Sequence, residues 1–240
     1  MTRIVAVVGA AGGVGTTRLT VECGATLARA GHDVAIFDAA FATQGLRSYV
    51  DEPVDADVTA LVTDEVSLGN VLYDLPFELP GRLTLAPVRA PFERLARAQT
   101  QQAAEQFERE LAAASLSNDI VLVDTPPVAS NQAVAAVDAA EQTVLVTEDT
   151  PRGNDALALS RGRLADIGVS DDIVFRNRDT GLLSEGIPIP ESEAIAAADA
   201  PVCVAPDETF APAVAHGLET LFETSLDLEF SSASRGILGG

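Results

Sequence analysis

The sequence predicts a single α/β domain built on a mostly parallel, twisted sheet with helices on both faces. Apolar runs of strand length alternate with stretches of helical periodicity, which is the order in which strand–helix–strand units form a parallel sheet. The 240 residues are 47% hydrophobic, and this is enough apolar material to bury the core of one domain. Residues 1–230 are assigned to this domain, and residues 231–240 to a flexible C-terminal tail.

The individual elements follow from the apolar runs and from the glycines and polar residues that bound them. Strands are expected at residues 3–8, 33–37, 83–86, 119–123, 143–147 and 172–175. Helices are expected at residues 16–30, 59–62, 67–73, 92–114, 154–167 and 211–222. Gly31 ends the first helix. The long helix at 92–114 has a polar face, which is either a solvated outer surface or a surface for a partner.

The charge balance of the chain is unusual. Asp and Glu total 36 against 15 basic residues, all of which are arginine, so the net charge is −21. At molar salt the Debye length falls to about 3 Å, and the repulsion between acidic side chains is then tolerated. We therefore expect that the chain is adapted to a salt-rich cytoplasm. A surface this acidic repels phosphates, which argues against nucleic-acid binding.

The cysteines and the hydropathy pattern indicate the same compartment. Cys23 and Cys203 lie far apart without a CxxC partner, so both are expected to be buried thiols in a reducing compartment. The longest apolar runs are much shorter than the roughly 20 residues that span a bilayer, and the N-terminus lacks the pattern of a signal peptide. We therefore expect a cytoplasmic protein.

The most informative segment is a glycine-rich loop at residues 9–15. Its glycines at positions 9, 12, 13 and 15 follow an apolar strand and precede a helix. Without side chains the backbone can approach a ligand closely, and the N–H groups at a helix N-terminus attract an anion. The loop therefore predicts phosphate binding, but it does not by itself select the ligand.

One alternative for this loop is a nicotinamide-binding enzyme. The G-x-x-G-x-x-G spacing of residues 9–15 resembles the loop of some nicotinamide dehydrogenases, and Asp38 after the second strand is placed to hold a ribose hydroxyl. A dehydrogenase also needs an acid–base residue. The two histidines, His32 in a turn and His216 on the last helix, are both expected at the surface.

Three segments together favour a second alternative. Residues 11–17 read Ala-Gly-Gly-Val-Gly-Thr-Thr, which resembles the deviant Walker A motif Lys-Gly-Gly-x-Gly-Lys-Ser/Thr of the MinD/ParA family. The strand at 119–123 leads into Asp124, Thr125 and two prolines, similar to that family's Walker B and switch II segment. Asn177 and Arg178 after the sixth strand resemble its Asn-Arg pair. The chain therefore resembles a MinD/ParA relative over nearly its whole length.

The resemblance implies a P-loop NTPase fold of the SIMIBI-like type and a weakly bound ATP or ADP with Mg²⁺. Asn177 would read the adenine edge, and Asp124 would reach the Mg²⁺ ion through water. The implied nucleotide-binding residues are Gly12, Gly13, Val14, Gly15, Thr16, Thr17, Arg18, Asn177 and Arg178. The implied metal ligands are Thr17, Asp38 and Asp124.

Uncharged residues occupy the positions that carry the family's catalytic chemistry. Thr16 stands at the position of the P-loop lysine that neutralises the β- and γ-phosphates, and Ala11 at that of the lysine that reaches across a dimer. Ala40 replaces the second aspartate of an Asp-x-Asp pair. Each lost group costs about a hundredfold to a thousandfold in rate, so hydrolysis is expected to be impaired or absent and no residue is assigned a catalytic role.

Two charged features have more than one interpretation. Arg18 is the nearest cation to the loop, but it lies two helix positions past Thr16. We therefore expect it to point away from the phosphates into a surface or salt-bridging role. Glu148 and Asp149 follow the fifth strand, where they form either a solvated acidic loop or a metal site.

Three functions remain open at this point. The first is a regulatory protein that positions or partitions cellular machinery, with a homodimer and an unidentified protein partner expected. The second is a slow ATPase that cycles between a monomer and a nucleotide-sandwich dimer, and the third is the nicotinamide-binding enzyme. Residues 231–240 carry one charge and little helix propensity, which argues against the basic amphipathic membrane helix of MinD proteins.

Overall fold

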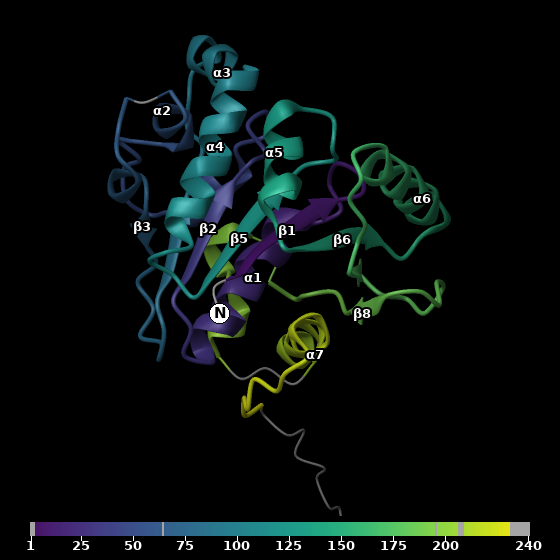
Figure 1. The fold of residues 1–240 in the computed structure, drawn as a ribbon. Helices are drawn as coiled ribbons and strands as arrows, with labels where there is room; N and C mark the ends of the chain where they lie inside the picture. The colour runs from purple at the N-terminus through teal and green to yellow at the C-terminus, as the bar shows by residue number, and fades with distance from the viewer. Residues whose placement is uncertain (1–2, 64, 195, 206–208, 231–240) are drawn as a thin grey trace, which may run out of the picture.

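The computed structural model describes residues 3–63, 65–194, 196–205 and 209–230. Its centre is an eight-stranded sheet in the order β3-β4-β2-β5-β1-β6-β7-β8 (Figure 1). Neighbouring strands are parallel except for β3 and β4, which pair antiparallel at one edge. The strands are β1 (Arg3–Gly9), β2 (Val34–Asp38), β3 (Tyr73–Asp74), β4 (Leu83–Ala86), β5 (Ile120–Thr125), β6 (Gln142–Glu148), β7 (Ile173–Asn177) and β8 (Ile187–Ile189).

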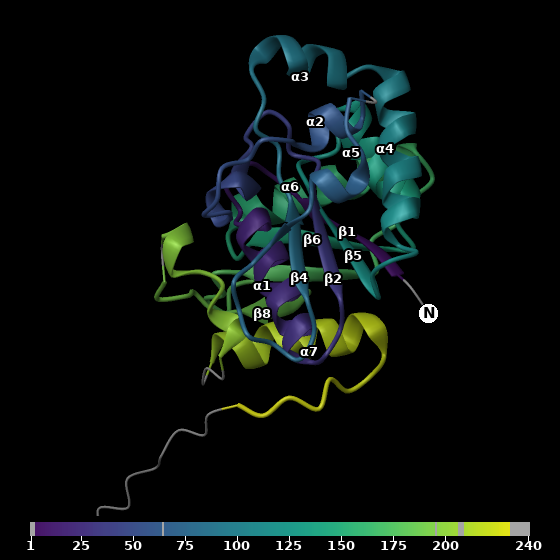
Figure 2. The ribbon, with the colours of Figure 1, turned by 90° about the vertical axis from the view of Figure 1, so that its left-hand side faces the viewer.

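Helices cover both faces of this sheet. Figure 2 shows α1 on one side of the strands and α4 and α5 on the other. The α-helices are α1 (Thr16–Arg29), α2 (Val58–Leu61), α3 (Phe92–Ala98), α4 (Gln101–Ala114), α5 (Asn131–Ala139), α6 (Pro151–Asp166) and α7 (Phe210–Phe222). The short 3-10 helices are η1 (Gly45–Tyr49), η2 (Leu68–Asn70), η3 (Ala197–Asp199) and η4 (Val202–Val204). The predicted single-domain α/β fold is confirmed.

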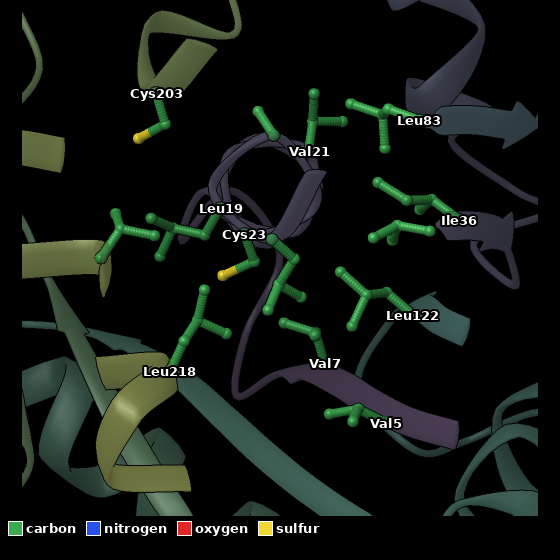
Figure 3. Close-up of a cluster of buried hydrophobic side chains, with 14 of the residues drawn as sticks. Val5, Val7, Leu19, Val21, Cys23, Ile36, Leu83, Leu122, Cys203 and Leu218 are labelled. Atoms are coloured by element: carbon green, nitrogen blue, oxygen red, sulfur yellow. The ribbon is translucent and has the colours of Figure 1, made fainter. Parts of the chain in front are cut away.

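The core follows from the alternation of side chains along the strands. Val5 and Val7 of β1 pack against α1 and α7. The alternate residues Ala6 and Val8 point to the other face and pack against α5 and α6. Figure 3 shows the α1 side of this core, where Leu19 of the helix lies above the strands. Both faces of the central strands are therefore buried, and the carboxyl ends of the strands remain as the place for a site.

Cys23 and Cys203 lie in this core as free, buried thiols. Burial raises the pKa of both well above the ordinary value of a thiol. The predicted burial of the two thiols is therefore confirmed, and the reducing compartment stays a prediction.

Several element boundaries differ from those predicted. The helix expected at 92–114 is two helices, because Thr100 caps α4 by accepting a hydrogen bond from the Ala103 amide. The segment 67–73 forms only η2 before it enters β3. Helix α5 and strand β8 were not predicted: α5 is a nine-residue, alanine-rich helix, and β8 is a three-residue edge strand.

Two expectations concern the ends of the chain and the membrane. The proposed tail, residues 231–240, lies outside the described residues, so the boundary at 230 stays a prediction. Within the described part of the chain, no helix has the length and hydropathy needed to cross a membrane.

Candidate phosphate-binding site

The glycine-rich loop connects β1 to α1 at the carboxyl edge of the sheet. Gly13 and Gly15 have φ angles of 84° and 89°, a left-handed conformation that glycine adopts without strain. Gly15 is also the N-cap of α1, and as a glycine it has no side chain to accept a hydrogen bond from the backbone N–H groups of the first turn. The first N–H groups of the helix are therefore available to an anion.

Thr16 lies close to the start of the loop. A Cβ atom added to Gly9 would lie 2.5 Å from the Thr16 Oγ1 atom, so the hydroxyl packs directly on the loop backbone. Thr16 thus supplies a short polar side chain where the resemblance implies a long cationic one.

A main cleft of about 430 Å³ opens in front of this loop. Besides residues of the loop and the first turn of α1, it is lined by Ala40, Thr43, Gly45, Ser48, Tyr49, Asp124, Thr125, Pro126, Pro127 and Ala197. The cleft thus brings together the loop, the segment after β2 and the end of β5 with the residues that follow it, all at the carboxyl edge of the parallel sheet. Among the described residues that line it, Arg18 is the only basic one.

Two buried carboxylates lie on neighbouring strands at this site, and one of them, Asp124, lines the main cleft. Asp38 and Asp124 are register partners on β2 and β5, and both side chains are buried. Burial and the neighbouring Asp124 raise the pKa of Asp38 to about 8, although backbone amides that include those of Ala40 and Val88 partly oppose this. Burial raises the pKa of Asp124 to about 6, and a hydrogen bond from Thr17 opposes it.

The two carboxylates differ in their hydrogen-bond partners. Asp38 accepts hydrogen bonds from the amides of Ala40 at 2.8 Å and Val88 at 3.4 Å. With no exposed surface, it is not placed to hold a ribose hydroxyl, which weighs against the nicotinamide alternative. The Oδ2 atom of Asp124 is buried and has no hydrogen-bond partner within the described part of the chain. An oxygen of this kind, beside a second acid, fits the chemistry of a divalent cation.

Asn177 and Arg178 contact the loop from the end of β7. The Asn177 side-chain amide donates to the Val14 carbonyl at 2.8 Å, and Arg178 pairs with Glu148 beside the Gly13 carbonyl. A second, smaller cavity of about 160 Å³ lies next to these two residues. We call it the side pocket, and it is lined by Gly15, Arg18, Leu19, Tyr49, Asn177, Arg178, Glu191, Ser192, Ala194 and Phe210.

Comparison with known proteins agrees with this geometry. A family model described as an AAA domain matches residues 2–159, which is more than half of the chain. This chain belongs to the AAA domain family. No curated protein matches it in sequence.

Solved structures share the fold of this AAA domain chain. MinD in the MinC:MinD cell division complex of Aquifex aeolicus has a TM-score of 0.73 at 21% identity, covering 95% of this chain and 99% of that one. The septum site-determining protein MinD of Pyrococcus horikoshii, solved with Mg-ADP, has a TM-score of 0.66 at 21% identity, with coverages of 78% and 74%. Apo McdA of Cyanothece has a TM-score of 0.61 at 20% identity, covering 96% and 84%. The predicted P-loop fold, which these MinD and McdA structures share, is confirmed.

Two buried carboxylates of this AAA domain chain have roles that the sequence did not reveal. Asp149 is neither solvated nor part of a metal cluster of three or more acidic, His or Cys residues within the described chain. It accepts hydrogen bonds from the amides of Thr180, Leu182 and Leu183. Burial alone would raise its pKa, but these hydrogen bonds outweigh burial and hold the pKa below the ordinary value.

The second is Glu22, in the middle of α1. Its side chain is buried and pairs with Arg18 at 2.6 Å, which agrees with the salt-bridging role expected for that arginine. It also accepts hydrogen bonds from the amides of Val202 and Cys203. A glutamate at an otherwise apolar helix position was the only sequence signal for this role.

Proposed function

We propose that this chain is a MinD/ParA-like nucleotide-binding protein that acts as a cytoplasmic regulatory or positioning and partitioning factor, with impaired or absent ATP hydrolysis. One observation carries the proposal. The main cleft keeps the amide donors of the loop and the partnerless oxygen of Asp124, whereas its one described basic residue, Arg18, is turned into a salt bridge.

Binding of a nucleotide would use the parts of the site that are present. The loop amides and the N-terminus of α1 attract phosphate oxygens. Thr17 and Asp124 would hold Mg²⁺, with Asp38 beside them, and the ion when bound would neutralise phosphate charge. The Mg-ADP bound to Pyrococcus horikoshii MinD supports this assignment.

Hydrolysis would be slow because charged side chains are missing from the cleft. Ala11 and Ala40 line the cleft with methyl groups, and the short side chain of Thr16 packs on the loop. None of the three offers a charge to the transition state. Since each such group is worth about a hundredfold to a thousandfold in rate, the chain is expected to bind nucleotide and turn it over at close to the uncatalysed rate.

A protein partner and a homodimer belong to the same proposal. The MinC:MinD complex of Aquifex aeolicus, which shares this fold, supports a partner-dependent role.

Phosphate release from Mg-ATP tests the proposal, measured in molar KCl because the net charge is −21. The control is the Thr17→Ala, Asp124→Ala double variant, which removes both side chains proposed to hold Mg²⁺. We expect weak ATP binding and phosphate release no faster than that of the control. Metal-dependent release above the control would instead support the slow ATPase that cycles between monomer and sandwich dimer. Binding of NADH but not of ATP would overturn the assignment.

Restoring the missing charges provides a second test. Ala11→Lys with Thr16→Lys should raise ATP affinity by on the order of tenfold per lysine, because each adds a charge-assisted contact to a phosphate. The matched control is Ala96→Lys with Ala112→Lys, which adds the same charge at two exposed helix positions. Equal ATP affinity of the two double variants in isothermal titration would contradict the proposed position of the phosphates.

A further inference from the structure

Three residues separate the two cavities at the site. Gly15, Arg18 and Tyr49 line both the main cleft and the side pocket. A ligand that extends from the glycine loop into the side pocket has to pass between Arg18 on α1 and Tyr49 on η1. The position of the Arg18 side chain therefore decides whether the two cavities can hold one continuous ligand.

The guanidinium of Arg18 is fully engaged in this position. Its Nε atom contacts Glu22 Oε1 at 2.6 Å, Nη1 donates to the Ala194 carbonyl at 3.0 Å, and Nη2 donates to Ser192 Oγ at 3.4 Å. Only 16% of the side chain is exposed. Arg18 thus ties α1 to the segment that follows β8, across the side pocket.

Glu22 holds Arg18 from a fixed position. The Glu22 side chain is completely buried, and its two oxygens also accept the Val202 amide at 3.0 Å and the Cys203 amide at 2.8 Å. Since these backbone contacts do not depend on Arg18, the carboxylate stays in place whether or not the guanidinium is bound to it. An arginine paired with such a buried, well-satisfied carboxylate is displaced only at a cost.

The same segment continues towards the main cleft. Ala197 of η3 lines the main cleft, and η3 contacts η1, which carries Tyr49. The contacts of Arg18 with Ser192 and Ala194 therefore fix the chain shortly before it reaches the main cleft.

We propose that Arg18 is a specificity-determining residue that restricts the side pocket, so that the site favours inorganic pyrophosphate over nucleoside diphosphates. This inference rests on the proposed function, because it assumes phosphates at the glycine loop and a nucleoside in the side pocket. Pyrophosphate with Mg²⁺ fills the main cleft alone and leaves the contacts of Arg18 intact. A nucleoside diphosphate has to break the contacts with Ser192 and Ala194, which lowers its affinity by on the order of tenfold.

Isothermal titration of Mg-ADP and Mg-pyrophosphate in molar KCl tests this, with the wild-type chain and Arg18→Thr compared. The matched control is Arg82→Thr, which removes an exposed arginine that is paired with Asp74. Arg18→Thr should bind ADP about tenfold more tightly than wild type. Its pyrophosphate affinity should stay within about twofold, because molar salt screens the lost charge. Arg82→Thr should change neither affinity.

A double variant distinguishes a loss of folding from a change in ligand affinity. Arg18→Thr with Glu22→Gln removes both charges of the pair, so no unpaired carboxylate remains buried if the single variant folds poorly. This double variant should show the same gain for ADP. ADP affinity that is unchanged or lower in these variants would overturn the role of Arg18 and leave the proposed function standing. Failure of every variant to bind either ligand would overturn the proposed function itself.

Discussion

Asp124 and Asp149 are both buried carboxylates at the carboxyl ends of strands of one sheet, yet their surroundings are opposite. Asp149 accepts the amides of Thr180, Leu182 and Leu183, and its pKa lies below the ordinary value. Asp124 has an oxygen without a partner among the described residues, and its pKa is raised to about 6. Burial is common to the two residues, so it does not separate a structural carboxylate from a functional one.

Hydrogen-bond satisfaction separates them. The charge of Asp149 is fully used inside the protein, where it fixes the loop between β7 and β8 with help from Arg176 at 3.6 Å. The charge of Asp124 is only partly used and lies beside a second acid, Asp38, whose pKa is raised to about 8. An arrangement of this kind favours a ligand that brings positive charge, as a metal ion does.

The largest effect predicted from this comparison concerns Asp149. Asp149→Ala leaves the three amide donors of the loop without an acceptor, so it should lower the unfolding temperature strongly. Asp149→Asn, which keeps one acceptor oxygen, should lower it less. Differential scanning calorimetry measures both. An Asp149→Ala chain that unfolds at the wild-type temperature would refute the structural role.

Most of the fold could be predicted because its signals are local. The apolar runs at β1, β2, β4, β5, β6 and β7 are bounded by turns, and these strands lie within a few residues of their predicted positions. Helix α5 was missed because its alanines carry little periodic contrast, and the break before α4 because Thr100 caps a helix inside a continuous helical pattern. Strand β8 is too short to show any period.

The candidate site was predictable only where residues are adjacent in sequence. The spacing of the glycines in the loop and the apolar strand before Asp124 can both be recognised in the sequence. The carboxyl edge of the parallel sheet brings these two segments together. The pairing of Glu22 with residues 202–203, and of Asp149 with 180–183, joins segments that are distant along the chain. Such contacts depend on tertiary packing, which no local pattern encodes.

The second prediction concerns pH. The raised pKa values of Asp38 and Asp124 mean that the folded state binds protons more tightly than the unfolded chain. Their contribution to stability is therefore present below the unfolded value of 3.8 and is lost as pH rises towards about 8. The lowered pKa of Asp149 has the opposite effect on stability. Its stabilising contribution is present above the unfolded value of 3.8 and is lost only as the pH falls below that value.

Urea unfolding at pH 5 and pH 8 measures this effect. We expect a loss of several kcal/mol on going to the higher pH, because the pKa of Asp38 lies about three units above pH 5 and that of Asp124 about one unit above it. Saturating Mg²⁺ should reduce the loss if the ion binds the pair. Equal unfolding free energies at the two pH values would show that the two carboxylates are not linked as described.

The smallest predicted effect is a gain of stability from Asp124→Asn. The Asn side chain removes the repulsion between the two acids and can donate to Asp38, so at pH 8 the free energy of unfolding should rise by about 1 kcal/mol. The same change should abolish any stabilisation by Mg²⁺, because the oxygen without a partner is then part of a neutral amide. Thr125→Ser is a mild control on the same strand, since Thr125 also lines the cleft but its hydroxyl is already paired with the Val123 carbonyl. If Asp124→Asn were destabilising and kept its response to Mg²⁺, the carboxylate would be structural like Asp149, and the distinction between the two aspartates would fail.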